Sequence, residues 1–168
     1  PNCPKGGWIP YLEVSKTNKG EVYVTVNDYH RNNFKPYAYK STDMGETFTQ
    51  IADENKVKGH TLAIVQDPEA PNLLFLGTDY GLYVTIDGGK TWNKWDNDYP
   101  SVPTRDLKIH PRELDLVVGT FGRAAWVLDD IRPLREMAQT NGKVLDQKLR
   151  LFTAPLKSLA VAELTLGR

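Results

Sequence analysis

The sequence is poor in cysteine and histidine, and this scarcity excludes several kinds of site. Cys3 is the only cysteine, so the chain has no internal disulfide and no cysteine-based metal site. The histidines, His30, His60 and His110, lie far apart, and none has a second ligand at the spacing of a zinc site. We therefore expect neither a metal ion nor another cofactor.

The sequence also lacks an excess of charge of either sign, because 21 Lys and Arg residues balance 21 Asp and Glu residues. Nucleic-acid-binding domains usually carry a basic excess, so we expect no nucleic-acid partner. No apolar run reaches the roughly 18 residues of a membrane-spanning helix, so we expect no membrane span. The start, Pro1-Asn2-Cys3-Pro4, has neither an initiator methionine nor a signal-peptide pattern, and we expect the chain to begin inside a longer protein.

The chain does contain an internal repeat of 42 to 44 residues. Ser41-Thr42-Asp43-Met44-Gly45-Glu46-Thr47-Phe48 and Thr85-Ile86-Asp87-Gly88-Gly89-Lys90-Thr91-Trp92 share the pattern Ser/Thr-x-Asp-x-Gly-x-Thr-aromatic. Their aspartates are 44 residues apart, and a third copy at Asp129, 42 residues further on, has lost the glycine and the aromatic residue. Gly77-Thr78 and Gly119-Thr120 are also 42 residues apart, so the repeat extends beyond the motif.

Each repeat is predicted to consist of short β-strands, because β-branched, aromatic and alternating apolar runs recur in it. Four antiparallel strands in 40–45 residues are typical of one β-propeller blade. We therefore predict an all-β fold of about three blades from an incomplete ring, at about residues 8–53, 60–96 and 103–131. In the C-terminal part, about 132–168, Ile131–Gln139 is predicted to form a short helical turn and Leu149–Phe152 a last strand.

The two complete motifs resemble the Asp-box, or BNR repeat, of sialidases, xyloglucanases and sortilin-type receptors. Residues 34–43, 76–83 and 119–130 extend the resemblance to the last blades of large bacterial proteins described as glycosyl hydrolase BNR-repeat or sortilin-like, over roughly residues 7–153. It implies a secreted, periplasmic or cell-surface protein. Relatives often have a histidine where this sequence has Phe121, so no role of that histidine is carried over.

The motif is predicted to be a structural turn. The aspartate accepts hydrogen bonds from backbone N–H groups, the Ser or Thr hydroxyl does so more weakly, the glycine supplies a positive φ, and the aromatic ring is buried between sheets. The residues in these roles are Ser41, Asp43, Gly45, Phe48, Thr85, Asp87, Gly89 and Trp92. Catalytic carboxylates are the alternative for the aspartates, but a catalytic acid is not needed once per blade.

The predicted strand order places any ligand site on the face opposite these turns, where loops surround the mouth of the ring. The longest loop there is 27–35, which is either a ligand loop or a solvated hairpin tip. The candidate ligand-binding residues are Asp28, Tyr29, His30, Arg31, Asp79, Tyr80 and Arg123. For Arg123 the alternative is an ion pair between blades, and Trp95 and Trp126 either stack on sugars or belong to the core.

Three functions remain open. The first is a recognition scaffold for a glycan, peptide or protein. The second is part of a glycoside hydrolase, sialidase- or xyloglucanase-like, whose catalytic residues lie partly on missing blades. No complete catalytic constellation is visible, although Asp28, Asp79, Asp96 and Asp98 are available. The third is a structural fragment without activity of its own.

An incomplete ring also has two open ends, which are predicted to expose apolar side chains. The residues expected to face solvent are Leu12, Val22, Val24 and Tyr37 at one end and Leu116, Val118, Trp126 and Leu128 at the other. We therefore expect the remaining blades of a longer chain, or a second copy, to cover these ends.

Overall fold

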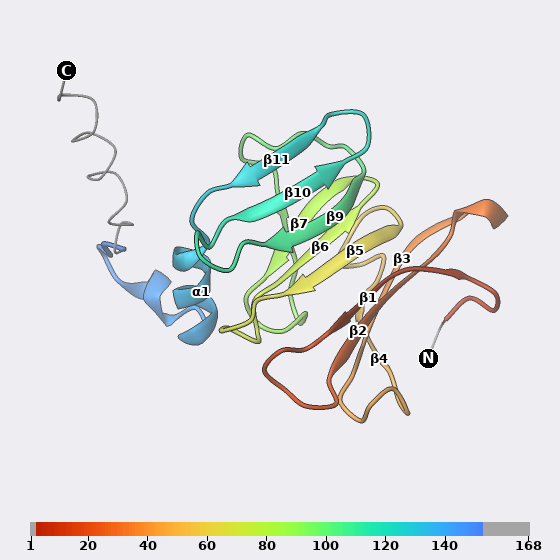
Figure 1. Ribbon diagram of the computed structural model, residues 1–168, viewed down its shortest axis with the longest axis horizontal. Helices are drawn as coiled ribbons and strands as arrows, with labels where there is room; N and C mark the ends of the chain where they lie inside the picture. Colours follow the sequence, from red (N-terminus) through yellow and green to blue (C-terminus); the bar gives the residue numbers. More distant parts are fainter. Residues whose placement is uncertain (1–2, 153–168) are drawn as a thin grey trace, which may run out of the picture.

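The computed structural model describes residues 3–152, which form three antiparallel β-sheets followed by a helix (Figure 1). Within each sheet the strands lie side by side in chain order. Sheet 1 contains β1 (Trp8–Val14), β2 (Val22–Asp28), β3 (Asn33–Ser41) and β4 (Thr49–Ala52). Sheet 2 contains β5 (Thr61–Gln66), β6 (Leu74–Thr78), β7 (Gly81–Thr85) and β8 (Asn93–Trp95). Sheet 3 contains β9 (Thr104–Ile109), β10 (Leu116–Thr120) and β11 (Ala125–Leu128).

The helix α1 (Arg132–Gln139) follows sheet 3, and two 3₁₀ turns, η1 (Tyr29–Arg31) and η2 (Lys143–Asp146), complete the described elements. The predicted mainly β architecture, with one sheet per sequence repeat, is confirmed. No helix within residues 3–152 is long and apolar enough to cross a membrane.

Sheet 2 lies between the other two sheets, and this position decides its burial (Figure 1). Its strands β5, β6 and β7 are buried along their whole length because both faces of the sheet are covered. In β10 of sheet 3, buried and exposed residues alternate at the start of the strand, as expected where only one face is covered. The core accordingly divides into an apolar cluster between sheets 1 and 2 and another between sheets 2 and 3.

The two outer faces of the stack match the expectation only in part. On the free face of sheet 1, Leu12 is 58% exposed as predicted, but Val22 and Tyr37 are half-buried and neighbouring side chains cover Val24. At the other end the prediction is wrong, because the four residues expected to face solvent pack against sheet 2. These residues are Leu116, Val118, Trp126 and Leu128. Alternation shows which residues share a face of a sheet, but not which of the two faces is covered. The exposed face of sheet 3 carries Val117 and Val127.

The C-terminal part contains one confirmed and one wrong prediction. The predicted helical turn at Ile131–Gln139 is the helix α1. The predicted strand at Leu149–Phe152 does not form, and Leu149 and Leu151 are 78% and 82% exposed. An alternating pattern needs a neighbouring strand to pair with, and this segment has none among residues 3–152. The rest of the predicted C-terminal part, from residue 153 onward, lies outside the described residues.

Both complete motifs form hydrogen-bonded turns, as the sequence predicts. The Asp87 carboxylate accepts the backbone N–H groups of Lys90 at 3.0 Å and Thr91 at 2.9 Å. The Asp43 carboxylate accepts the N–H of Thr47 at 2.9 Å and also binds its hydroxyl. These hydrogen bonds, first that of the Thr47 hydroxyl, lower the pKa of Asp43 to about 2. The aspartates therefore stabilise the turns as acceptors, and neither points free into a pocket.

The other motif positions also have the expected local roles. Gly45 and Gly89 have φ values of 93° and 92°, a region that glycine adopts without strain. Trp92 is buried between sheets 1 and 2, where its Nε1 donates to the Ile51 carbonyl at 2.9 Å. Phe48 instead lies half-buried on the free face of sheet 1. The prediction of a ring between two sheets is thus confirmed for Trp92 but wrong for Phe48, because the described chain has no sheet on that side.

The third motif copy differs from the other two in the position of its aspartate and in the element that follows it. By strand pairing, Leu128 occupies the place of Thr85, so Asp130, and not Asp129, is the aspartate of this copy. Asp130 accepts the backbone N–H of Arg132 at 3.2 Å and also binds its guanidinium, with Nε at 2.5 Å. The chain then continues into α1 instead of a fourth strand. Sheet 3 therefore has three strands where the other sheets have four.

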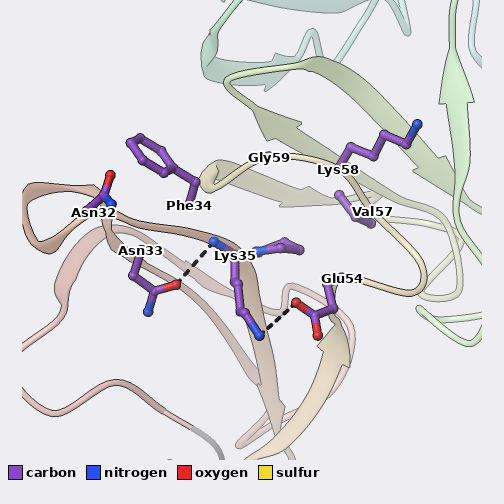
Figure 2. A pocket seen from close by; sticks show the side chains of 9 residues that line it. Asn32, Asn33, Phe34, Lys35, Glu54, Val57, Lys58 and Gly59 are labelled. Atoms are coloured by element: carbon purple, nitrogen blue, oxygen red, sulfur yellow. Dashed lines mark hydrogen bonds and ion pairs between the residues drawn. The ribbon is translucent and has the colours of Figure 1, made fainter.

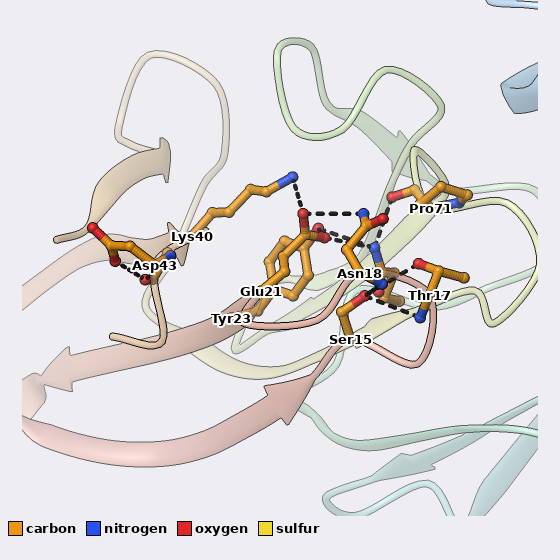
Figure 3. A network of polar contacts seen from close by, with 10 residues as sticks. Ser15, Thr17, Asn18, Glu21, Tyr23, Lys40, Asp43 and Pro71 are labelled. Carbon is orange, nitrogen blue, oxygen red and sulfur yellow. Dashed lines mark hydrogen bonds and ion pairs between the residues drawn. The ribbon is translucent and has the colours of Figure 1, made fainter. Parts of the chain in front are cut away.

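A buried polar network fixes sheet 1 against sheet 2 near the motif turns (Figure 3). The Glu21 carboxylate accepts the Tyr23 hydroxyl at 2.6 Å and the Gln66 amide at 2.9 Å, and Lys40 Nζ lies 2.9 Å from it. Burial alone would raise the pKa of Glu21, but the hydrogen bonds from Tyr23 and Lys40 outweigh it and lower the pKa. Glu21 is thus a charged group with a structural role.

The helix α1 is attached to sheet 2 by a buried ion pair. Arg135 Nε lies 2.9 Å from both carboxylate oxygens of Asp67, and Arg135 Nη1 lies 2.8 Å from Glu69. Asp67 is fully buried and Arg135 is 5% exposed. The pair therefore holds the helix against the turn that joins β5 to β6.

Candidate functional site

Two hydrogen bonds show which loops share a face of the molecule. The N–H of Met44 donates to the Gly20 carbonyl at 2.8 Å, and the N–H of Gly88 donates to the Asn72 carbonyl at 2.9 Å. Each motif turn therefore lies beside the turn that joins the first two strands of its own sheet, as the predicted topology requires. The β2–β3 and β6–β7 hairpin ends and the connection 53–60 belong to the opposite face.

The β2–β3 hairpin is better ordered than the predicted loop 27–35. The strands continue to Asp28 and resume at Asn33, and the tip is the short turn η1 followed by Asn32 in the left-handed region, with φ of 59°. The buried Asp28 carboxylate accepts Arg31 Nε at 2.7 Å and the Asn33 amide at 3.3 Å. Asp28 and Arg31 therefore stabilise the tip and hold Tyr29 in position.

Four rings gather beside this tip, and we call them the aromatic cluster: Tyr29, His30, Phe34 and His60. Tyr29 stacks on His60 with ring centroids 5.2 Å apart and an interplanar angle of 23°. Phe34 lies 6.1 Å from His60. Tyr29 and Phe34 are 39% and 52% exposed, so the cluster presents apolar ring surface to solvent over a buried imidazole.

The imidazole of His60 faces Asp79, from the β6–β7 hairpin. His60 Nδ1 and Asp79 Oδ2 are 3.1 Å apart, within ion-pairing distance but not in hydrogen-bond geometry. His60 Nδ1 and Asp79 Oδ1 are buried and have no hydrogen-bond partner among residues 3–152. A Cβ on Gly59 would lie 1.9 Å from Asp79 Oδ1, so only glycine allows this approach. Tyr80 lies beside the same glycine and is 55% exposed.

A cavity of about 360 Å³ opens next to the aromatic cluster, between the β3 edge and the connection 53–60 (Figure 2). Its lining residues are Asn32, Asn33, Phe34, Lys35, Pro36, Glu54, Val57, Lys58 and Gly59. Lys35 Nζ and Glu54 form an ion pair of 2.9 Å across it, and this hydrogen-bonded contact raises the pKa of Lys35. The cavity therefore combines an apolar wall with polar groups of both signs.

Three carboxylates of this region each face a basic group, and a fourth, Asp53, accepts the backbone N–H of Asn55. Asp28 pairs with Arg31, Glu54 with Lys35, and Asp79 lies against His60. No group of three His, Cys, Asp or Glu side chains in the described part of the chain is placed to hold a metal ion. The arrangement can stack against a ligand and exchange hydrogen bonds with it.

The structure brings most of the predicted ligand residues together. The residues on or next to the aromatic cluster are Asp28, Tyr29, His30, Arg31, Asp79 and Tyr80. Arg123 belongs to the β10–β11 hairpin of sheet 3; it is exposed and forms no ion pair within residues 3–152. His60 is not among the predicted ligand residues, although it ends the connection 53–60, which lies on the face where the ligand site was predicted.

Comparisons with known proteins support the fold. No family model matches the sequence, and no curated protein matches it either. Among solved structures, the GH74 enzyme of Niastella koreensis matches with a TM-score of 0.59 and 23% identity, covering 73% of this chain and 21% of that one. YCF48 bound to D1 peptide matches with a TM-score of 0.48 and 18% identity, covering 76% and 42%.

The chain thus spans about a fifth of the GH74 enzyme and less than half of YCF48. At 23% identity the likeness to the GH74 enzyme concerns the fold alone. Together with three stacked antiparallel sheets, one per sequence repeat, it identifies the fold as consecutive β-propeller blades, the last of which has three strands.

Proposed function

We propose that these blades belong to a recognition propeller that binds a glycan or peptide at the aromatic cluster and the adjoining cavity. The observation that carries this proposal is the exposed ring surface of Tyr29 and Phe34 beside a cavity of about 360 Å³. Tyr29 and Phe34 offer flat apolar surface for a sugar face or a side chain.

The hydrolase alternative is less well supported by this geometry. Most glycoside hydrolases need two carboxylates that act as acid and base or nucleophile across the scissile bond. Here Asp28 and Glu54 each form an ion pair with a basic side chain, and Asp79 lies against His60. Recognition therefore explains the cluster with these residues alone, whereas catalysis requires further residues from other blades.

The proposal is tested on glycan and peptide arrays with the 168-residue chain and with Tyr29→Ala and His60→Ala. We expect at least one class of probe to bind, and each substitution to weaken binding by about tenfold, the equivalent of roughly 1.4 kcal/mol. Tyr29 is partly exposed, so its substitution separates loss of binding from loss of folding.

Met44→Ala is the matched control, because Met44 is 74% exposed on the opposite, motif-turn face. Binding that Tyr29→Ala and His60→Ala leave unchanged would contradict the proposal, as would equal weakening by Met44→Ala or the absence of any bound probe. Release of reducing sugar from a bound glycan would favour the hydrolase alternative.

We also propose that a further blade covers the free face of sheet 1. Tyr39 and Phe48 occupy there the positions that Tyr83 and Trp92 occupy in sheet 2, where sheet 1 buries them. Beside them, Leu12 helps to line a mainly apolar cavity of about 290 Å³. The isolated chain is therefore expected to self-associate in sedimentation, and Leu12→Glu to make it monomeric. A monomeric wild-type chain would contradict this expectation.

The resemblance to exported proteins leads us to propose that the protein acts outside the cytoplasm. Fractionation of cells that produce it tests this: recovery in the cytoplasmic fraction would contradict the proposal.

A further inference from the structure

The β10–β11 hairpin ends in a tightly held turn that projects a large ring into solvent. Thr120 donates to the Ala124 carbonyl through its N–H at 3.1 Å and through its hydroxyl at 2.6 Å. The N–H of Phe121 donates to the Pro103 carbonyl at 2.9 Å, so the turn is attached to the connection between β8 and β9. The ring of Phe121 is nevertheless 67% exposed. Single exposed rings are common on protein surfaces, so the side chains around Phe121 decide whether it belongs to a site.

The guanidinium of Arg105 lies over this ring, with its central carbon 5.3 Å from the ring centroid. Arg105 stands at a β-bulge, because Thr104 and Asp106 pair with consecutive residues of β10 and leave Arg105 as an extra residue in β9. Bulges are frequent next to binding sites, where they redirect a side chain. The bulge and the ring of Phe121 together fix where this exposed guanidinium lies.

Sheet 2 has a bulge at the same point, but a different kind of residue occupies it. Thr61 and Ala63 pair with consecutive residues of β6, which makes Leu62 the extra residue in β5. Leu62 is only 4% exposed, whereas the arginine at the equivalent place in β9 is exposed. An apolar residue suits this place where packing decides, so packing does not explain the arginine of sheet 3.

A second guanidinium lies on the same hairpin, two residues beyond Phe121. Arg123 is exposed, and neither it nor Arg105 forms an ion pair or a hydrogen bond through its side chain within residues 3–152. The acidic neighbour Asp106 is engaged elsewhere, because it accepts the Tyr11 hydroxyl of sheet 1 at 3.3 Å. We call Arg105, Phe121 and Arg123 the arginine patch. A guanidinium binds a carboxylate through two parallel N–H groups, and stacking on a ring leaves those groups free.

Contacts between loops join the arginine patch to the aromatic cluster on the same face. The connection 53–60 meets the β6–β7 hairpin, since a Cβ on Gly59 would lie 3.2 Å from Tyr80 Cβ. That hairpin meets the connection between β8 and β9, since a Cβ on Gly81 would lie 3.9 Å from the Pro100 carbonyl oxygen. The hydrogen bond from Phe121 to this connection completes the series. The hairpins of all three sheets thus carry exposed rings, which follow one another across the face.

The distance between the two ends of this series sets the length of a ligand that reaches both. Packed sheets lie about 10 Å apart, so the hairpins of sheets 1 and 3 are about 20 Å apart. An extended polypeptide advances about 3.3 Å per residue, so about six residues connect the aromatic cluster to the arginine patch. A single sugar or amino acid is too short for this span.

We propose that the arginine patch is the anion-binding end of one extended site, and that this site takes an acidic peptide in an extended conformation. An aromatic or large apolar residue of the peptide contacts Tyr29 and Phe34, and carboxylates about six residues away bind Arg105 and Arg123. A polypeptide fits both ends with one chain, because it can carry an apolar side chain at one position and neighbouring carboxylates at another. This inference rests on the function proposed above and names the class of its ligand.

The test uses arrays of amidated eight-residue peptides that begin with Phe, end with Glu-Glu and vary in the five residues between. Matched arrays end with Gln-Gln, or have one varied residue in place of five. We expect the best peptides of the first array to bind the 168-residue chain about tenfold more tightly than their Gln-Gln counterparts at low salt, and this difference to shrink at high salt, because exposed charges are screened. The short peptides are expected to bind weakly, since they cannot reach both ends.

Substitutions in the chain locate the two ends of the bound peptide. Arg105→Gln and Arg123→Gln are each expected to weaken binding of Glu-Glu peptides by about fivefold and to leave Gln-Gln peptides unchanged. Tyr29→Ala is expected to weaken binding of both. Arg112→Gln is the matched control, because Arg112 is an exposed arginine between β9 and β10, on the opposite, motif-turn face. This control is expected to leave binding unchanged.

The outcomes separate this inference from the function on which it rests. Equal binding of Glu-Glu and Gln-Gln peptides would overturn the inference and leave the proposed function intact. The same holds for binding that Tyr29→Ala weakens but Arg105→Gln and Arg123→Gln do not. Binding that needs the arginines but not Tyr29 would overturn the proposed function and the extended site together. Polygalacturonate serves as an acidic glycan: if it binds through the arginines and no peptide binds, the assignment to a peptide is wrong.

Discussion

Replacing Asp87 by alanine is expected to destabilise the fold through the turn between β7 and β8. The carboxylate accepts the N–H groups of Lys90 and Thr91 and the hydroxyls of Thr85 and Thr91, the latter at 2.7 and 2.6 Å. These four donors lose their acceptor together in Asp87→Ala. The same turn leads directly to Trp92, whose ring is buried between sheets 1 and 2.

The magnitude follows from the environment of the donors. A hydrogen bond to a charged acceptor contributes about 1.5–3 kcal/mol, and an ordinary one about 0.5–1.5 kcal/mol. Lys90 and Thr91 are exposed, so water replaces part of what Asp87→Ala removes. We therefore expect the free energy of unfolding to fall by about 1–3 kcal/mol in total, well below the sum over four separate bonds. Asp87→Asn keeps one acceptor oxygen and is expected to lose less than Asp87→Ala.

The assay is urea unfolding of the 168-residue chain, followed by tryptophan fluorescence. Asp96→Ala is the matched control, because it removes the same charge from an exposed side chain and is expected to change stability by less than about 0.5 kcal/mol. If Asp87→Ala and Asp96→Ala have equal effects, the turn-stabilising role of the carboxylate is refuted. Ligand binding at the aromatic cluster is expected to be unaffected, since the turn lies on the opposite face.

Three further predictions concern the core, the buried ion pair and pH. Leu76→Ala removes a fully buried side chain between sheets 1 and 2, so we expect a loss of about 2–5 kcal/mol in urea unfolding. Arg135→Met removes the ion-pair partner of the buried Asp67, which keeps only the backbone N–H groups of Glu69 and Ala70, and is expected to cost about 3–5 kcal/mol in thermal unfolding; a cost below about 1 kcal/mol would contradict the pairing. The pKa of Asp43 is about 2 in the folded chain, against about 3.9 in the unfolded chain. Its contribution to the free energy of unfolding is therefore complete above about pH 4 and is lost as the pH falls toward 2, because the unfolded state takes up the proton first. Asp43→Ala is expected to flatten the rise of stability between pH 2 and 4, and an unchanged slope in acid titrations would contradict the assignment.

The sequence by itself determined the repeat, the strand type and the chemistry of the motif turns. These features are local: alternation fixes which side chains share a face, glycine permits the positive φ, and aspartate accepts N–H groups a few residues away. The hydrogen bonds of Asp87 and the φ of Gly89 follow from residues within one turn. Strand order alone determines which connections lie together, so the sequence also predicted the face that carries the candidate site.

The tertiary structure alone decided which face of each sheet is covered and which distant side chains meet. The alternation in sheet 3 was read correctly, yet Val118 and Trp126 pack inward, because only the stacking of sheets selects the covered face. His60 joins Tyr29 and Asp79 across three separate connections, a meeting that no local pattern encodes.

The missing fourth strand of sheet 3 is also a tertiary result. After β11 the chain follows Asp130 and Arg132 into α1, which the buried contact between Arg135 and Asp67 holds against sheet 2. The alternating residues Leu149 and Leu151 then have no strand beside them and stay exposed. Alternation determines what a segment can do as a strand, but a strand forms only where a neighbour satisfies its backbone groups, and that neighbour is chosen by the fold.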